Sequence, residues 1–220
     1  MGLREDNREL RRRRIRRAAR TLVAKHGFEG LSMRTLARKA DLSVTTLYHL
    51  YGSKDEIRLA LCHELLDGID RALEEVPLER PLERARAVVT VGVDHLVGDA
   101  SLSRAGILAS RHGRGGMDDD EITPRAVEMQ RIAIQAAMSE GLLRPDLRPD
   151  LLAAQVYDGF RRAALLWAVG ELEPSGFRSK ALYALYVCLL GVATTRTRPA
   201  ILAELRALEP ELSRQRRNAA

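Results

Sequence analysis

The chain has 220 residues, of which 45% are hydrophobic and 30% charged, with a formal net charge of +6. This composition excludes a disordered chain, and the lack of an apolar run of about 20 residues excludes a membrane span. The charged N-terminus lacks the apolar core of a signal peptide, so we expect a cytoplasmic protein with no membrane partner. Cys62 and Cys188 form no CxxC pair and no cluster with His, so we expect no metal site and no cofactor.

The first predicted helix spans residues 9–26 and stops at Gly27. Its apolar residues recur on one helical face: Ile15, Ala18, Ala19, Leu22 and Val23. Residues 1–60 contain 15 Lys and Arg against 7 Asp and Glu, whereas residues 61–220 contain 21 against 23. The positive charge is therefore concentrated at the N-terminal end, as neutralisation of nucleic-acid phosphates requires.

Residues 31–54 have the pattern of two short helices joined by a tight turn. Five apolar residues fall where such a helix-turn-helix buries its inner side: Leu36, Ala37, Ala40, Leu42 and Leu47. Asp41 occupies the turn, where Asp tolerates a left-handed backbone better than most residues. The side chain of Ser43 is placed to cap the second helix.

The second of these helices is the predicted recognition helix, because its face away from Leu47 is free to reach base edges or phosphates. Ser53 and Glu56 have the spacing of a capping box, so another helix should begin at Lys54. A cation at that helix start opposes the helix dipole, which favours a phosphate lying against it. The predicted DNA-binding residues are Arg34, Ser43, Val44, Thr45, Thr46, Tyr48, His49 and Lys54.

A set of residues between positions 9 and 60 has a familiar spacing: Ala18-Ala19, Gly27-Phe28, Leu36-Ala37, Ala40, Ser43, Thr46-Leu47-Tyr48 and Ser53-Lys54. With this set the region resembles the DNA-binding domain of the TetR (tetracycline repressor) family of bacterial transcriptional regulators. The resemblance implies an all-helical homodimer whose first three helices bind operator DNA. It also implies a larger C-terminal domain that binds a small ligand and thereby relieves repression. Two residues depart from the family pattern, since Asp41 replaces its usual Gly and Leu50 its usual His, with His49 one place earlier.

Further helices are predicted beyond the helix-turn-helix. They cover residues 54–76, 82–97 and 102–111, and another begins with Thr123-Pro124 as cap and first residue and ends at Gly141. The expected fold is therefore all-α. We divide it into a helix-turn-helix DNA-binding domain at residues 1–53 and a ligand-binding and dimerisation domain at residues 54–220.

Two long segments near the C-terminus, residues 151–169 and 177–195, are apolar on more than one face. Helices of this kind need two partners, so we expect one face to pack in the domain and the other against a second copy. The family resemblance implies the same pair. The predicted interface residues are Gly159, Ala163, Trp167, Leu185 and Leu189. A two-fold dimer would place its recognition helices in successive major grooves, so the operator should be an imperfect palindrome.

No sequence motif identifies the ligand of the larger domain. Aromatic residues make up only 4% of the chain, which favours an aliphatic pocket with a few polar groups. The candidates are polar residues on mainly apolar helices, and for each of them surface exposure or an internal hydrogen bond is the alternative. They are Asp94, His95, Arg104, Arg111, His112, Gln130, Gln155 and Tyr157.

Other functional classes fit less well. No nucleophile motif or phosphate-binding loop accompanies the isolated pairs Asp94-His95 and Arg111-His112, so we expect no catalytic residues and no enzyme. A nucleoid-type architectural protein would also be basic and dimeric, but it would need neither a large apolar domain nor a recognition helix with a non-basic outer face. A TetR-like regulator without a small-molecule effector, and an activator instead of a repressor, are alternatives that the sequence does not separate.

Overall fold

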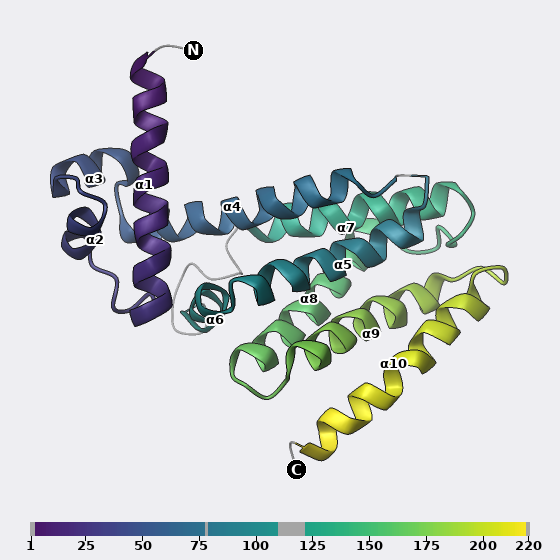
Figure 1. The fold of residues 1–220 in the computed structure, drawn as a ribbon. Helices are drawn as coiled ribbons and strands as arrows, with labels where there is room; N and C mark the ends of the chain where they lie inside the picture. Colours follow the sequence, from purple (N-terminus) through teal and green to yellow (C-terminus); the bar gives the residue numbers. More distant parts are fainter. Residues whose placement is uncertain (1–2, 78, 110–121, 219–220) are drawn as a thin grey trace. The chain divides into compact units, whose positions relative to one another are not determined.

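The computed structural model describes residues 3–77, 79–109 and 122–218, and these residues are predominantly helical (Figure 1). The helices are α1 (Leu3–His26), α2 (Met33–Lys39), α3 (Val44–Tyr51), α4 (Lys54–Glu74), α5 (Pro81–Gly98), α6 (Ala100–Ala109), α7 (Ile122–Ser139), α8 (Pro149–Ala168), α9 (Pro174–Val192) and α10 (Arg198–Asn218). Within the described ranges, strand pairing is limited to one isolated bridge between Leu143 and Ala193. The predicted all-α class is confirmed. None of the described helices is both long and apolar enough to cross a bilayer.

The chain divides into two compact units. Unit 1 comprises residues 1–65 and 99–119, and unit 2 comprises residues 66–98 and 120–220. The division falls inside α4, whereas the boundary drawn from the sequence lies at the start of that helix. The difference arises because Ile57 and Leu61, in the first turns of α4, are buried in the core of unit 1.

Unit 1 is built around α1, α2 and α3. Its buried core contains Ile15, Ala18, Ala19, Val23, Phe28, Leu31, Leu36, Ala37, Ala40, Leu47, Tyr51, Ile57 and Leu61. Helices as short as α2 and α3 are marginal alone in water, so packing against α1 and the first half of α4 stabilises them. Leu102 and Ala105 of α6 pack against the same core. The apolar stripe predicted for the first helix is therefore confirmed.

Serine side chains fix the starts of three helices in unit 1. The Oγ atoms of Ser32, Ser43 and Ser53 each accept a hydrogen bond from the backbone N–H three residues later, at 3.1, 3.0 and 3.1 Å. Such caps satisfy backbone donors that the first turn leaves free. Asp41 has φ 53°, so the predicted left-handed turn is confirmed as well.

In unit 2, α8 packs between α7 and α9, and α10 packs on α9. α8 approaches α9 closely at Gly159, where an ideal Cβ would lie only 2.4 Å from the Cβ of Ala184. Phe177 of α9 stacks on Trp167 of α8 with ring centroids 5.4 Å apart. Glycine at position 159 therefore allows the two helices to bury their aromatic and aliphatic side chains together.

Two predicted helix starts need correction, and one helix was not predicted at all. α1 begins near Leu3, where Glu5 and Asp6 lie in its first turn and complement the helix dipole, instead of at residue 9. α7 begins at Ile122, before the predicted cap at Thr123, because Pro124 is tolerated in a first turn that needs no N–H. α10 lies in a segment for which the sequence analysis predicts no helix, and it contains Pro210 in its interior.

Candidate nucleic-acid interface

The outer face of α3 is accessible to a ligand as large as a duplex. Leu47 is fully buried, whereas Val44 and Tyr48 are 37% and 50% exposed. Thr45 and His49 are exposed on the same helix. A fully buried residue flanked by exposed neighbours fixes which face points outward, so the orientation predicted for the recognition helix is confirmed.

The other predicted contact residues lie at helix starts. Ser43 is exposed, and its Oγ lies 2.8 Å from the hydroxyl of the half-buried Thr46. Arg34 is exposed in the first turn of α2, and Lys54 is half-buried in the first turn of α4. Both cations oppose the dipole of their own helix, an arrangement that an anion at the helix start would relieve.

Part of the arginine run in α1 supports the end of α3. The guanidinium of Arg12 lies 5.8 Å from the ring centroid of Tyr51, and its Nη2 donates to the carbonyl of Leu50 at 3.5 Å. Arg16 donates to the Tyr51 hydroxyl at 3.3 Å. These two arginines therefore have a structural role, and they are less available to DNA than their exposed neighbours.

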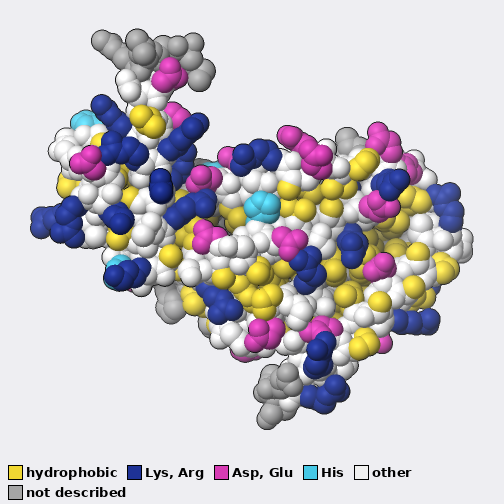
Figure 2. All heavy atoms as spheres, viewed as in Figure 1, with side chains coloured by type: hydrophobic (Ala, Val, Ile, Leu, Met, Phe, Trp, Pro, Cys, Tyr) yellow, Lys and Arg dark blue, Asp and Glu magenta, His cyan; other side chains and the backbone are white. Residues whose placement is uncertain are grey.

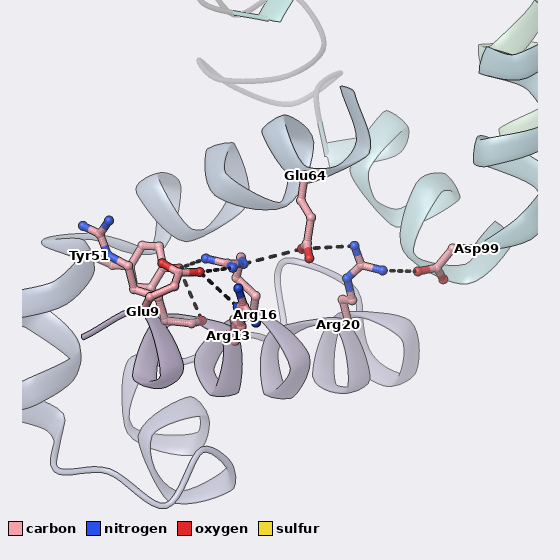
Figure 3. Close-up of polar contacts among 8 residues, drawn as sticks. Glu9, Arg13, Arg16, Arg20, Tyr51, Glu64 and Asp99 are labelled. Atoms are coloured by element: carbon pink, nitrogen blue, oxygen red, sulfur yellow. Dashed lines mark hydrogen bonds and ion pairs between the residues drawn. The ribbon is translucent and has the colours of Figure 1, made fainter. Parts of the chain in front are cut away.

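A chain of ion pairs continues from Arg16 along α1 (Figure 3). Glu9 contacts Arg13 at 3.4 Å and Arg16 at 2.9 Å, and Glu64 of α4 lies between Arg16 at 3.6 Å and Arg20 at 3.1 Å. Arg20 also reaches Asp99, just before α6, at 3.5 Å. Burial alone would lower the pKa of Arg16, but hydrogen bonds to Glu9 and Tyr51 raise that pKa above its ordinary value. This network of ion pairs and hydrogen bonds thus holds α1, α3 and α4 of unit 1 in one arrangement.

A basic groove of about 310 Å³ opens on the other side of α1. Its polar lining comes from Arg14, Arg17 and Thr21 of α1, Lys39 at the end of α2, and Asp41 in the turn. Arg14 bonds to the Asp41 carboxylate at 2.8 Å. Figure 2 shows Lys and Arg side chains gathered over α1, α2 and α3. Sequence reasoning missed Lys39 because a cation in a last helical turn is already explained by the helix dipole.

The predicted effector residues that the structure describes do not all belong to one unit. Arg104 belongs to unit 1, whereas the other described candidates belong to unit 2. Asp94 is exposed and paired with Arg178, and Gln155 is exposed. Nδ1 of the half-buried His95 lies 3.0 Å from the Val91 carbonyl. Arg111 and His112 lie outside the described residues.

Two predicted effector residues are buried in unit 2, Gln130 and Tyr157. The guanidinium of Arg161 lies 5.9 Å from the ring centroid of Tyr157. The side-chain amide of Gln130, in contrast, has no hydrogen-bond partner at either its oxygen or its nitrogen. Among the described candidates, Gln130 therefore has the strongest chemical reason to bind a ligand.

Most of the residues predicted for the dimer interface are buried within a single chain. Four of them are at most 1% exposed within a single chain: Ala163, Trp167, Leu185 and Leu189. The fifth, Gly159, packs against Ala184 of the same chain. The first four side chains are therefore covered within one chain, whereas Gly159 is partly exposed, and their part in a dimer contact stays a prediction. An apolar periodicity marks burial, but it does not show whether the partner lies in the same chain.

Comparison with known proteins finds a family model that is similar to part of unit 1. Residues 15–61 match the model of a family described as "Bacterial regulatory proteins, tetR family". Over 80 residues the chain is 34% identical to the HTH-type transcriptional repressor KstR of Rhodococcus jostii (strain RHA1). The matched stretch covers 36% of this chain and 38% of that repressor, well under half of each.

Solved structures with the same fold cover most of the chain. A TetR-family transcriptional regulator from Pectobacterium atrosepticum has a TM-score of 0.66 and 22% identity, covering 89% of this chain and 99% of that one. Thermus thermophilus FadR, a repressor solved in complex with lauroyl-CoA, has a TM-score of 0.61 and 20% identity, covering 83% of this chain and 95% of that one. At these identities the likeness shows a shared fold that includes both units.

Proposed function

We propose that the chain is a transcriptional repressor of the tetR family of bacterial regulatory proteins, which its residues 15–61 match, and that it binds a palindromic operator as a homodimer. In this proposal a small molecule binds unit 2 and releases the DNA. The observation that carries the proposal is the outer face of α3. There the side chains of Thr45, Tyr48 and His49 are exposed instead of packed in the core of unit 1.

The chemistry of unit 1 supports a duplex as its ligand. The outer face of α3 offers hydroxyls, an imidazole and an aromatic ring, groups that hydrogen-bond or pack against base edges in a major groove. Arg34 and Lys54 would contact phosphates at the starts of α2 and α4. The basic groove beside α1 would add further phosphate contacts through Arg17 and Lys39. Base reading and phosphate binding thus come from different side chains.

The surface of unit 2 supports a second copy of the chain as partner. Apolar side chains remain exposed on α8 and α9, with Leu151 at 59% and Val187 at 49%. A recognition helix of eight residues covers too few base pairs for a specific site, so two copies are needed. We therefore place the dimer contact on the outward faces of α8 and α9 instead of on their buried residues.

Release by an effector requires a connection between unit 2 and the DNA-binding residues. α4 supplies it, because the helix that begins with Lys54 continues to Glu74. Within unit 2, Arg125 of α7 binds Asp67 and Asp70 of α4 at 2.7 and 2.6 Å. A ligand that favours a different position of α7 would shift α4 through these ion pairs and so disfavour the DNA-bound arrangement.

The test is selection of duplexes from a random pool by the full-length protein, followed by fluorescence anisotropy on the enriched sequence. We expect an imperfect palindrome whose two halves lie about one helical turn apart. A duplex with one half scrambled should bind much more weakly. Enrichment of no sequence, with equal affinity for all duplexes, would favour the architectural alternative instead.

A further inference from the structure

Gln130 lies among the inward-facing residues of α7. The buried positions of this helix are Met129, Gln130, Ala133, Ile134, Ala137 and Met138. This spacing places them on one face, and α7 packs against α5 and α8. Gln130 is only 2% exposed, so its amide lies inside unit 2.

The buried amide of Gln130 makes no hydrogen bond within the protein. Neither Oε1 nor Nε2 of Gln130 has a hydrogen-bond partner, and leaving such groups unpaired in an apolar interior lowers stability. Methionine has a similar length and no such cost, and it occupies two other positions on the same face, Met129 and Met138. Packing therefore does not require a glutamine at position 130. A polar group of a bound ligand would supply the hydrogen bonds that the amide lacks.

The surroundings determine which ligand could bind there. Among the residues of unit 2 that the structure describes, the buried polar side chains without an aromatic ring are Gln130, Ser179 and Thr197, and none of them is charged. The Thr197 hydroxyl already donates to the carbonyl of Leu142 at 2.7 Å. The partly buried guanidinium of Arg84 is held by the carbonyls of Leu73 and Val76, so a carboxylate or phosphate beside Gln130 would lack a fully buried cationic side chain to offset its desolvation.

The neighbours of Gln130 can also make room for a ligand. Ala133 and Ala137, on the following two turns, are small. The two methionines of the same face have flexible, unbranched side chains that repack easily around a new shape. Rearrangement of these side chains could therefore accommodate an apolar molecule beside Gln130.

We propose that Gln130 is the hydrogen-bonding anchor of the effector site, and that the effector is an uncharged, mainly apolar molecule carrying a carbonyl or hydroxyl group. The Nε2 group would donate to a carbonyl and Oε1 would accept from a hydroxyl. This inference rests on the proposed function. Arg125 lies five residues earlier on α7, about 7.5 Å along the axis, so the anchor is close to the ion pairs with α4.

The experiment compares full-length wild type with Gln130→Met, and uses Gln135→Met, an exposed glutamine on the same helix, as the matched control. The probes are neutral lactones, ketones and alcohols of eight to sixteen carbons, about thirty compounds chosen to fill an aliphatic site, each paired with a carboxylate of the same chain length. Thermal unfolding reports binding, and anisotropy on the selected operator reports release.

Without ligand, Gln130→Met should raise Tm by about 2–4 °C and bind the operator as wild type does, whereas Gln135→Met should leave Tm unchanged. At least one neutral probe should stabilise the wild type and weaken operator binding about tenfold, while its carboxylate partner does not. Gln130→Met should lose that response and Gln135→Met should keep it.

The inference is overturned if Gln130→Met is no more stable than wild type, if carboxylates act as well as their neutral partners, or if no neutral probe binds. In each of these cases the DNA-binding proposal would still stand, provided that the wild type binds the selected operator in the absence of ligand. Loss of operator binding by the wild type itself would instead contradict the proposed function.

Discussion

Neighbouring residues on α3 have opposite environments, since Leu47 is fully buried and Tyr48 is half exposed. Replacing Tyr48 by Ala should therefore remove an outward contact without creating a cavity. We expect operator affinity to fall by about 1–3 kcal/mol, roughly 5- to 150-fold, with little change in Tm. Anisotropy and thermal unfolding measure the two effects. Tyr48→Phe separates the ring from the hydroxyl, and equal affinity of Tyr48→Ala and wild type would mean that this face does not touch DNA.

Asp41 has two roles that can be separated by one substitution. Its backbone is left-handed, and its carboxylate forms an ion pair with the guanidinium of Arg14 in the basic groove. Asn tolerates the same backbone but carries no charge, so Asp41→Asn should change stability by less than about 1 kcal/mol. Because Arg14 becomes available to a phosphate, DNA affinity should rise and the slope of log K against log salt should steepen by about one.

The double variant Asp41→Asn with Arg14→Ala is the control for this prediction. It should return the salt slope to the wild-type value or below. An unchanged slope in Asp41→Asn alone would place the groove beside α1 away from the DNA backbone, and would leave the recognition helix as the main contact.

At the scale of helices, the contact between α8 and α9 depends on the absence of a side chain at Gly159. An added Cβ would lie 2.4 Å from the Cβ of Ala184, so Gly159→Ala must push the two helices apart. We expect a loss of about 1–3 kcal/mol in unfolding free energy, measured by chemical denaturation.

Gly191, also on α9, has no atom within 4 Å of its ideal Cβ. Gly191→Ala should therefore be neutral or stabilising by up to about 1 kcal/mol. Equal effects of the two variants would contradict this account of the packing.

Helix boundaries were predictable from the sequence where local chemistry sets them. Ser43 and Ser53 cap α3 and α4 through their own side chains, so their positions alone predict the helix starts. α10 lacked such a signal, since Pro210 in its interior normally argues against a helix. Packing on α9 stabilises it instead, with Ile201 and Leu205 buried. That contact joins distant parts of the chain and leaves no local pattern.

The site was predictable to the same extent. The outer face of α3 follows from the single inward residue Leu47, but the basic groove depends on α1 and α2 being brought together in space. For α8 and α9 the sequence predicts apolar faces without saying which face is internal. Trp167 and Leu189 therefore looked suited to a dimer contact, although the chain buries them itself. Exposure in the folded chain favours Val187 and Leu151 for the proposed dimer contact instead.

At the scale of the whole molecule, operator binding and dimerisation should be coupled, because in the proposed dimer each protomer would supply one recognition helix to half of the palindrome. Val187→Glu places a charge on the exposed apolar surface of α9, where a second copy would have to bury it without a partner. We expect the dimer dissociation constant to rise at least about 100-fold, corresponding to roughly 3 kcal/mol, as measured by analytical ultracentrifugation. Operator affinity should fall with it and become dependent on protein concentration, while Tyr48 and its neighbours still bind a single half-site weakly.

Leu147→Glu is the matched control, because Leu147 is similarly exposed at 55% but lies in the loop between α7 and α8. It introduces the same charge and should leave both the dimer and operator affinity unchanged. If Val187→Glu is still a dimer at concentrations where wild type is one, the contact between protomers lies elsewhere on unit 2. If it becomes a monomer and yet binds the full palindrome as tightly as wild type, the two recognition helices are not coupled through dimerisation, and each half-site is read independently.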